Sequence, residues 1–445
     1  MRFDLLTRRP VGIVLLTSLV SVLSAAARDA EPIDVQQALE LQAQQIRALQ
    51  DEVRMLRDEL AAPESSPALS MADVDRRIEA FETHPTSQLF VSGYGAAGYS
   101  DQQNSDGSLS MLLVPIFHYK LSDQLHLTGE LELDLRGSTS EVAVEYAQID
   151  YLLNDYLTLS IGKFLLPFNA FSERLHPSWI NKLPSLPPIY GAHGSGGGIV
   201  PILSDTGVQV RGGLRLPWSI DERGSRVNYA FYMTNGPRLE PESDFEKLAE
   251  FLTDEGVIAD EADLLSALGV SHGGTEIEFG ETFRDNNQNK AIGGRLGLLP
   301  VPQLEIGASF LQGSFDDHSD LDLRLYGFDL SYRLGPLHLL GEFMDRRNDK
   351  VGGGTERING YYLQGGLLLR DLASVAGPIS TALDRTELVL RTGEVDDDLD
   401  YRETTFGVAY WLTPSVPLKL AYTWRDEDHT EVNNDQLLLQ IAFGF

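Results

Sequence analysis

The spacing of apolar residues along the chain changes once, near residue 88. Before it, Leu39, Ile46, Val53 and Leu60 recur every seven residues. Such a narrow stripe cannot be buried by one helix alone, so we predict a self-associating α-helical coiled coil over residues 28–62. A lone amphipathic helix packed on the body of the protein is the alternative.

After residue 88, apolar and polar residues alternate with a period of two, which is the β-strand pattern. It is clearest in 125–136, where leucines occupy one face and mostly charged residues the other. Several of these segments exceed ten residues, whereas a globular strand has about five or six and a tilted membrane strand needs about 9–11. The sixteen predicted strands are 88–100, 109–121, 124–136, 140–153, 156–167, 205–216, 226–235, 289–299, 303–314, 321–334, 336–346, 357–370, 384–395, 401–412, 417–428 and 435–445.

The connections between these strands alternate between short and long. Pairs such as Ser122-Asp123 and Asn154-Asp155 form short turns, whereas 168–204 and 236–288 are the longest connections and fall on the other side. An even strand count with short turns on one side is typical of bacterial outer-membrane barrels. We therefore predict an all-β fold, a transmembrane antiparallel β-barrel over residues 88–445. A soluble sandwich shares the alternation but not the strand lengths.

The amino-terminal segment has the features of an export signal. Arg2, Arg8 and Arg9 precede a mostly apolar run, and small residues follow at 25–27. This order predicts a signal peptide over residues 1–27 rather than an anchor helix, because the apolar run is short for a membrane span. Residues 63–87 are predicted to be a linker with a short helix. The expected location is the cell outer membrane of a Gram-negative-type bacterium.

Composition excludes several functions. The chain has no cysteine, which removes disulfides and thiolate metal sites, and its formal net charge of -31 argues against a nucleic-acid partner. Hydrolase, metalloprotease and phosphate-loop spacings are absent from the sequence. We predict that the protein is not an enzyme and has no cofactor or metal. The acidic segment 236–288, which contains two short amphipathic stretches, is interpreted as an external loop.

A short motif adds a family resemblance. Residues 161–168 read Ile-Gly-Lys-Phe-Leu-Leu-Pro-Phe, and a Glu-Arg pair follows. This pattern resembles the phosphate-selective porins O and P, with Asn169 where that family usually has glycine. The resemblance implies a sixteen-stranded trimeric outer-membrane channel. The matching residues are Gly162, Lys163, Phe164, Pro167, Phe168, Glu173 and Arg174.

Candidate pore residues lie in one long loop and at the strand positions that alternate with the apolar ones and so face the lumen. In sixteen-stranded porins the third external loop folds inward, and by strand count that loop is 168–204. A loop that caps the rim or contacts a neighbouring protomer is the alternative. The basic loop residues lead us to expect a weak preference for anions. The loop candidates are Arg174, His176, Lys182 and His193, and the strand candidates are Arg211, Arg215, Glu130, Glu132 and Asp134.

The sequence thus predicts a porin that lets small hydrophilic solutes or ions diffuse passively. The alternative is a non-conducting structural barrel whose coiled coil mediates trimerisation or cell-wall contact. The expected partners are a homotrimer, outer-membrane lipid, lipopolysaccharide, small solutes and the outer-membrane assembly machinery. Phe445 ends an alternating last strand and is the expected signal for that machinery.

Overall fold

The computed structural model describes most of the chain beyond residue 88. The described residues are 89–103, 105–136, 139–191, 198–218, 224–239, 277–279, 287–370, 382–396, 401–427 and 434–445. The predicted signal peptide, coiled coil and linker lie outside these residues and stay predictions.

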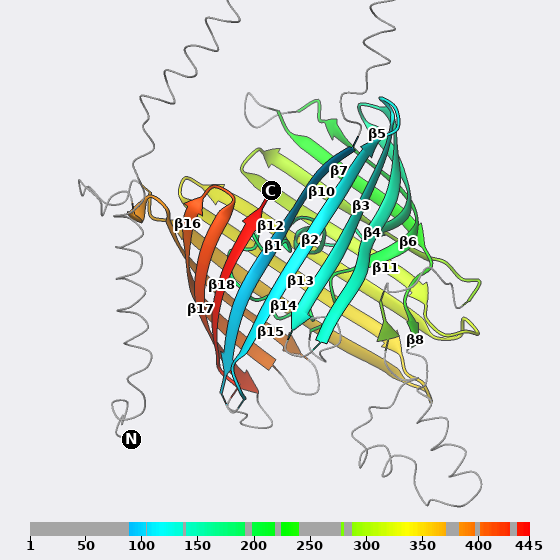
Figure 1. Ribbon diagram of the computed structural model, residues 1–445. Helices are drawn as coiled ribbons and strands as arrows, with labels where there is room; N and C mark the ends of the chain where they lie inside the picture. Colours follow the sequence, from blue (N-terminus) through cyan, green and yellow to red (C-terminus); the bar gives the residue numbers. More distant parts are fainter. Residues whose placement is uncertain are drawn as a thin grey trace, which may run out of the picture. The chain divides into compact units, whose positions relative to one another are not determined.

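Sixteen antiparallel strands close into one barrel (Figure 1). Each predicted strand corresponds to one barrel strand, with boundaries that differ by up to three residues. The strands on either side of the long connection after residue 370, β14 and β15, pair directly with each other. The strands are β1 (Leu89–Gln102), β2 (Ser108–Lys120), β3 (Leu125–Arg136), β4 (Thr139–Asn154), β5 (Leu157–Leu165), β6 (Ser204–Arg215), β7 (Arg226–Thr234), β10 (Ala291–Val301), β11 (Leu304–Ser314), β12 (Asp322–Leu334), β13 (Leu337–Asp349), β14 (Thr355–Leu368), β15 (Thr386–Asp396), β16 (Tyr401–Thr413), β17 (Val416–Glu427) and β18 (Gln436–Gly444).

The barrel closes where its first and last strands meet. Pairing of β1 with β18 runs from Tyr94↔Gly444 to Gln102↔Gln436. Phe445 continues this ladder, since its backbone exchanges two hydrogen bonds of 3.0 Å with Gly93. Closure leaves no open sheet edge, which is the condition for strands to cross lipid.

The two faces of the wall differ as a membrane barrel requires. On β12, Phe328 and Leu330 point outward and are exposed, whereas Asp329 between them points inward and is buried. Exposed aliphatic and aromatic side chains recur on the outer face of strands around the barrel. This chain is therefore a transmembrane barrel of the Gram-negative outer membrane. Among the described residues, no helix is long and apolar enough to cross a membrane.

The short turns form where the sequence supplies local hydrogen-bond acceptors. Ser122 Oγ accepts hydrogen bonds from the backbone N–H groups of Gln124 and Leu125. Asn154 Oδ1 accepts one from the N–H of Tyr156, at 2.9 Å. Side-chain acceptors of this kind stabilise tight turns. The connections on this side of the barrel are therefore short.

The acidic segment contains one feature that the sequence pattern did not predict. Two short strands, β8 (Arg238–Leu239) and β9 (Ile277–Glu278), pair as a separate sheet. An ion pair of 2.5 Å between Arg238 and Glu278 holds its ends together. The amphipathic stretches predicted between the two strands lie outside the described residues.

Candidate functional site: an inward loop and the cavity beside it

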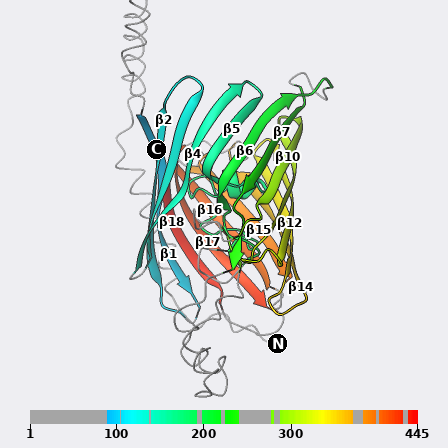
Figure 2. The same cartoon turned by 90° about the vertical axis from the view of Figure 1, so that its right-hand side faces the viewer.

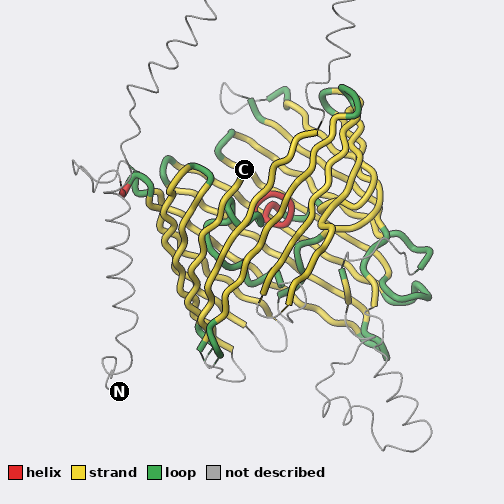
Figure 3. The backbone as a smooth tube through the Cα atoms, viewed as in Figure 1, coloured by secondary structure: helices red, strands yellow, loops and turns green. Residues whose placement is uncertain are grey.

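The connection between β5 and β6 turns back into the barrel. It leaves the wall at Leu166 and returns at Leu203, where the Leu166 N–H donates to the Leu203 carbonyl at 2.8 Å. Its one helical turn, η1 (Phe171–Leu175), is a π-helix. Figures 2 and 3 show this turn between the walls of the barrel. Residues 166–203 are called the inward loop below.

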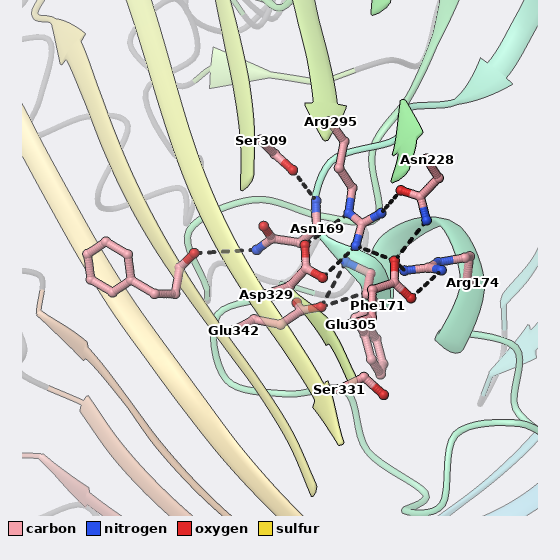
Figure 4. Close-up of polar contacts among 12 residues, drawn as sticks. Asn169, Phe171, Arg174, Asn228, Arg295, Glu305, Ser309, Asp329, Ser331 and Glu342 are labelled. Atoms are coloured by element: carbon pink, nitrogen blue, oxygen red, sulfur yellow. Dashed lines mark hydrogen bonds and ion pairs between the residues drawn. The ribbon is translucent and has the colours of Figure 1, made fainter. Parts of the chain in front are cut away.

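Glu342 on β13 is the main anchor of the inward loop (Figure 4). Its Oε1 accepts hydrogen bonds from the backbone N–H groups of Ala170, at 3.0 Å, and Phe171, at 2.7 Å. Its Oε2 accepts one of 2.6 Å from the Tyr190 hydroxyl. One buried carboxylate therefore holds both the start of η1 and a residue further along the loop.

Arg295 on β10 organises a second group of contacts beside the first (Figure 4). It donates to Asp329 at 2.9 and 2.6 Å and to Glu305 at 2.9 Å. Glu305 also receives a bidentate pair from Arg174 of the inward loop, at 3.1 and 3.0 Å. The basic loop residue Arg174 therefore forms an ion pair with the barrel wall.

Lysine and arginine side chains hold residues 178–185 of the inward loop against the wall. Lys182 pairs with Glu387 on β15, and Arg391 on the same strand donates to the Ser185 hydroxyl at 2.6 Å. Lys419 on β17 donates to the Ser178 carbonyl. Arg391 and Lys419 are each only 1 % exposed, so the loop covers them.

Apolar side chains fill the space between the loop and the wall. Phe171 contacts the rings of Tyr190 and Tyr362, with centroids 5.1 and 6.3 Å apart. Phe164 and Phe168 belong to the same buried cluster, which gathers residues of the loop and of several strands. The described core therefore lies inside the barrel, where the burial of these rings stabilises the loop.

The family-motif residues have structural roles at the loop's start. Gly162 has φ of +127° and lies so close to β4 that an added Cβ would be 2.3 Å from the Ala147 carbonyl oxygen. Lys163 Nζ donates to the Val144 carbonyl at 2.9 Å. Asn169 adopts a left-handed conformation, φ +53°, which glycine and asparagine accept more readily than other residues. Glycine and asparagine can therefore serve the same purpose there.

A cavity of about 470 Å³ lies beside the inward loop. Along β1 it extends from Tyr94 to Ser100, six residue steps or about 20 Å of strand. Its lining includes the acidic residues Glu132, Asp134 and Glu145, and the described lining residues include no lysine or arginine. The full lining is Tyr94, Ala96, Gly98, Ser100, Ser108, Ser110, Met111, Leu112, Glu132, Asp134, Glu145, His176, Ser178, Asn181, Leu183, Pro184, Ser185, Leu186, Gly191, Ile202, Gln436, Leu438 and Gln440.

Three of the predicted pore residues line this cavity, namely Glu132, Asp134 and His176. His176 Nδ1 donates to the Ser172 carbonyl at 2.7 Å. Burial of the imidazole lowers the pKa of His176 to about 4, so this side chain is neutral at pH 7 and adds no positive charge.

The other predicted pore residues lie elsewhere. Arg174 and Lys182 form the ion pairs described above, and Arg211 pairs with Glu173 of the loop at 2.7 Å. Glu130 is buried against the wall, where it accepts a hydrogen bond of 3.2 Å from the Tyr94 hydroxyl. Arg215 is exposed at the end of β6, and His193 lies outside the described residues.

The anchoring roles of Glu342 and of Ser309 are not evident from the sequence; Ser309 Oγ accepts a hydrogen bond of 3.0 Å from the Asn169 N–H. The only local signal is strand parity, because a single acid such as Asp329 stands between outward-facing apolar residues. Parity places a side chain in the lumen but does not say which segment it contacts. The described residues contain no group of three or more potential metal ligands.

No family model matches the chain, and no curated protein matches it either. Solved structures of outer-membrane porins do match. OmpF of Salmonella typhi, in complex with daunomycin, is 10% identical with a TM-score of 0.50, covering 80% of this chain and 97% of that one. The outer-membrane channel DcaP of Acinetobacter baumannii is 12% identical, with a TM-score of 0.48, over 80% and 97% of the two chains. An anion-selective porin from Comamonas acidovorans is 13% identical, with a TM-score of 0.47, over 80% and 99%. At these identities the likeness concerns the fold alone, and that of OmpF agrees with a β-barrel.

Proposed function

We propose that this protein is a porin through which small hydrophilic solutes and ions diffuse passively across the outer membrane. The single observation that carries the proposal is the cavity between the inward loop and the wall formed by β1–β4 and β18, which is lined by polar and apolar side chains. A loop that narrows a barrel without filling it leaves a path whose width and charge decide what passes. The cavity residues of β1, β2 and β3 would form one side of this path, and the loop the other.

Membership of the phosphate-selective porin O and P family is part of this proposal. It is supported by the motif residues, since Gly162, Lys163 and Asn169 each meet a local structural requirement at the base of the loop. Phosphate as the solute has less support. The basic loop residues Arg174 and Lys182 are engaged with wall carboxylates rather than directed into the cavity.

We further propose a homotrimer that lies among outer-membrane lipid and lipopolysaccharide and is inserted by the assembly machinery. Support for the last point is the position of Phe445, which is exposed on the outer face and stacks on Phe443 with ring centroids 6.1 Å apart. An aromatic terminus accessible on the last strand is what a recognition signal requires.

Recordings from purified, folded protein in a planar lipid bilayer test the proposed function. We expect discrete, long-lived current steps in potassium chloride, and a trimer should close in three equal sublevels. Protein unfolded by heating before addition is the control and should give no steps. Folded protein that inserts without any steps would instead support the non-conducting structural barrel.

A further inference from the structure

Three arginines stand in a row on the outer face of the barrel. Arg324 on β12 lies opposite Arg347 on β13, which lies opposite Arg357 on β14. Arg324 shares a face of β12 with the outward-pointing Phe328, and residues opposite each other in a ladder point to the same side. The three side chains are 51, 55 and 57% exposed. They line an open cavity of about 370 Å³.

This row lies directly beyond the lipid-facing band. The next outward residues along β12 are Tyr326, Phe328 and Leu330, and all three are exposed. At the level of the row β12 begins and β13 ends, on the side of the barrel where the inward loop joins β5 and β6. In outer-membrane barrels the side with the long connections faces outward, and aromatic residues mark the membrane–water interface. The arginines therefore lie at the level of the head groups of the outer leaflet.

Asp345 fixes two of the three guanidinium groups. Its side chain is 7% exposed and accepts hydrogen bonds from Arg347 Nε, at 2.9 Å, and Arg357 Nε, at 3.1 Å. The Nη2 group of each arginine also donates to Asp345, which leaves the Nη1 group of each available. Arg324 is 3.8 Å from Asp322, which exceeds hydrogen-bond distance. The row thus presents oriented donors with room for a further acceptor.

The other acids that line the cavity have partners of their own. Glu356 pairs with Arg346 and Lys350, at 3.2 and 3.4 Å. Asp349 Oδ2 accepts a hydrogen bond of 3.0 Å from the backbone N–H of Asp322. A ligand with several anionic oxygens would therefore complement the three guanidinium groups better than these carboxylates do.

We propose that Arg324, Arg347 and Arg357 bind a phosphate group of lipopolysaccharide in the outer leaflet. The planar guanidinium fork matches phosphate oxygens, and basic pockets beside membrane-spanning segments bind phosphorylated lipid head groups. The acyl chains of the same molecule would lie against the exposed Phe328 and Leu330. This proposal adds a defined site to the lipopolysaccharide contact proposed above, and it does not depend on conduction.

Native mass spectrometry of protein refolded from urea, which carries no lipopolysaccharide, tests the site. The probes are short-chain lipopolysaccharide and its dephosphorylated form. The double variant R324Q/R357Q should bind the phosphorylated probe about tenfold or more weakly than the unmodified protein, and it keeps Arg347 as a partner for Asp345. The matched control R385Q/R402Q removes two other exposed arginines, one before β15 and one on β16; its affinity should equal that of the unmodified protein.

Three results would overturn the proposal. The first is equal affinity of R324Q/R357Q and the unmodified protein, and the second is equal binding of the two lipid forms. The third is inorganic phosphate alone binding as tightly as the lipid, which would make free phosphate the ligand. If the double variant does not fold, R324Q, which leaves both contacts of Asp345 intact, should bind about fivefold more weakly, whereas R402Q should not. Current steps in a bilayer are measured separately, so failure here leaves the porin function untouched.

Discussion

Replacing Glu342 with leucine is expected to free the inward loop and to enlarge the channel. The substitution removes the acceptor for two backbone N–H groups and one tyrosine hydroxyl, all of which lie inside the barrel. Each hydrogen bond contributes about 0.5–1.5 kcal/mol, and the donors left without an acceptor inside the barrel add to the loss, so the loop's attachment should weaken by about 2 kcal/mol or more. Single-channel conductance should rise with increased current noise, and added protease should cleave within 166–203.

The conservative variant E342Q is the control for this prediction. A glutamine keeps one carbonyl oxygen for the N–H groups of Ala170 and Phe171, and its amide can donate to the Tyr190 hydroxyl oxygen. We expect E342Q to retain the original conductance and protease resistance. If E342L also retains both, Glu342 does not hold the loop.

Replacing Arg295 with methionine is expected to destabilise the barrel more than any substitution of an exposed charge. Its guanidinium bridges Asp329 and Glu305, and the Asp329 side chain is only 1% exposed. Removing one member of a buried ion pair costs about 3–5 kcal/mol, because the other charge stays buried. Urea unfolding of detergent-folded protein, followed by electrophoretic mobility, measures the loss.

Arg174 offers a matched comparison for Arg295, because it pairs with the same Glu305 but its side chain is 38% exposed. The variant R174M should lose about 1 kcal/mol or less, as exposed ion pairs do. The double variant R295M/D329L should recover much of the loss of R295M, since it also removes the buried Asp329 carboxylate and leaves Glu305 paired with Arg174. Equal losses in R295M and R174M would contradict the central role of Arg295.

The barrel itself could be predicted from the sequence because a membrane imposes a strict rule on every strand. Lipid on one side and polar lumen on the other force a period of two over ten or more residues, as in β3 and β12. Turn signals such as Ser122 and Asn154 then mark the strand ends, since their side chains accept local backbone hydrogen bonds. Both signals depend on neighbouring residues only, so each strand and its turns can be recognised from their own part of the sequence.

The path of the inward loop could not be predicted in the same way, because its contacts join distant residues. The Asn169 N–H donates to Ser309 Oγ across 140 positions, and Lys182 pairs with Glu387 across 205. Basic loop residues were expected to line the pore because the sequence does not reveal their partners. The π-helix at Phe171–Leu175 depends on Glu342, 171 positions beyond Phe171.

The absence of cysteine from the chain allows the central claim to be tested with single introduced thiols. The claim is that solutes pass beside the loop, along β1–β4, and not through the region that the loop covers. Ser110 is exposed in the cavity, whereas Thr423 on β17 is fully buried, with its hydroxyl 3.0 Å from that of Thr405.

The measurement is the block of single-channel current by a cationic methanethiosulfonate reagent applied to S110C and T423C, with the unmodified protein as the cysteine-free control. The account predicts that current through S110C falls promptly, while T423C does not respond. Rapid block of T423C with no effect on S110C would contradict it.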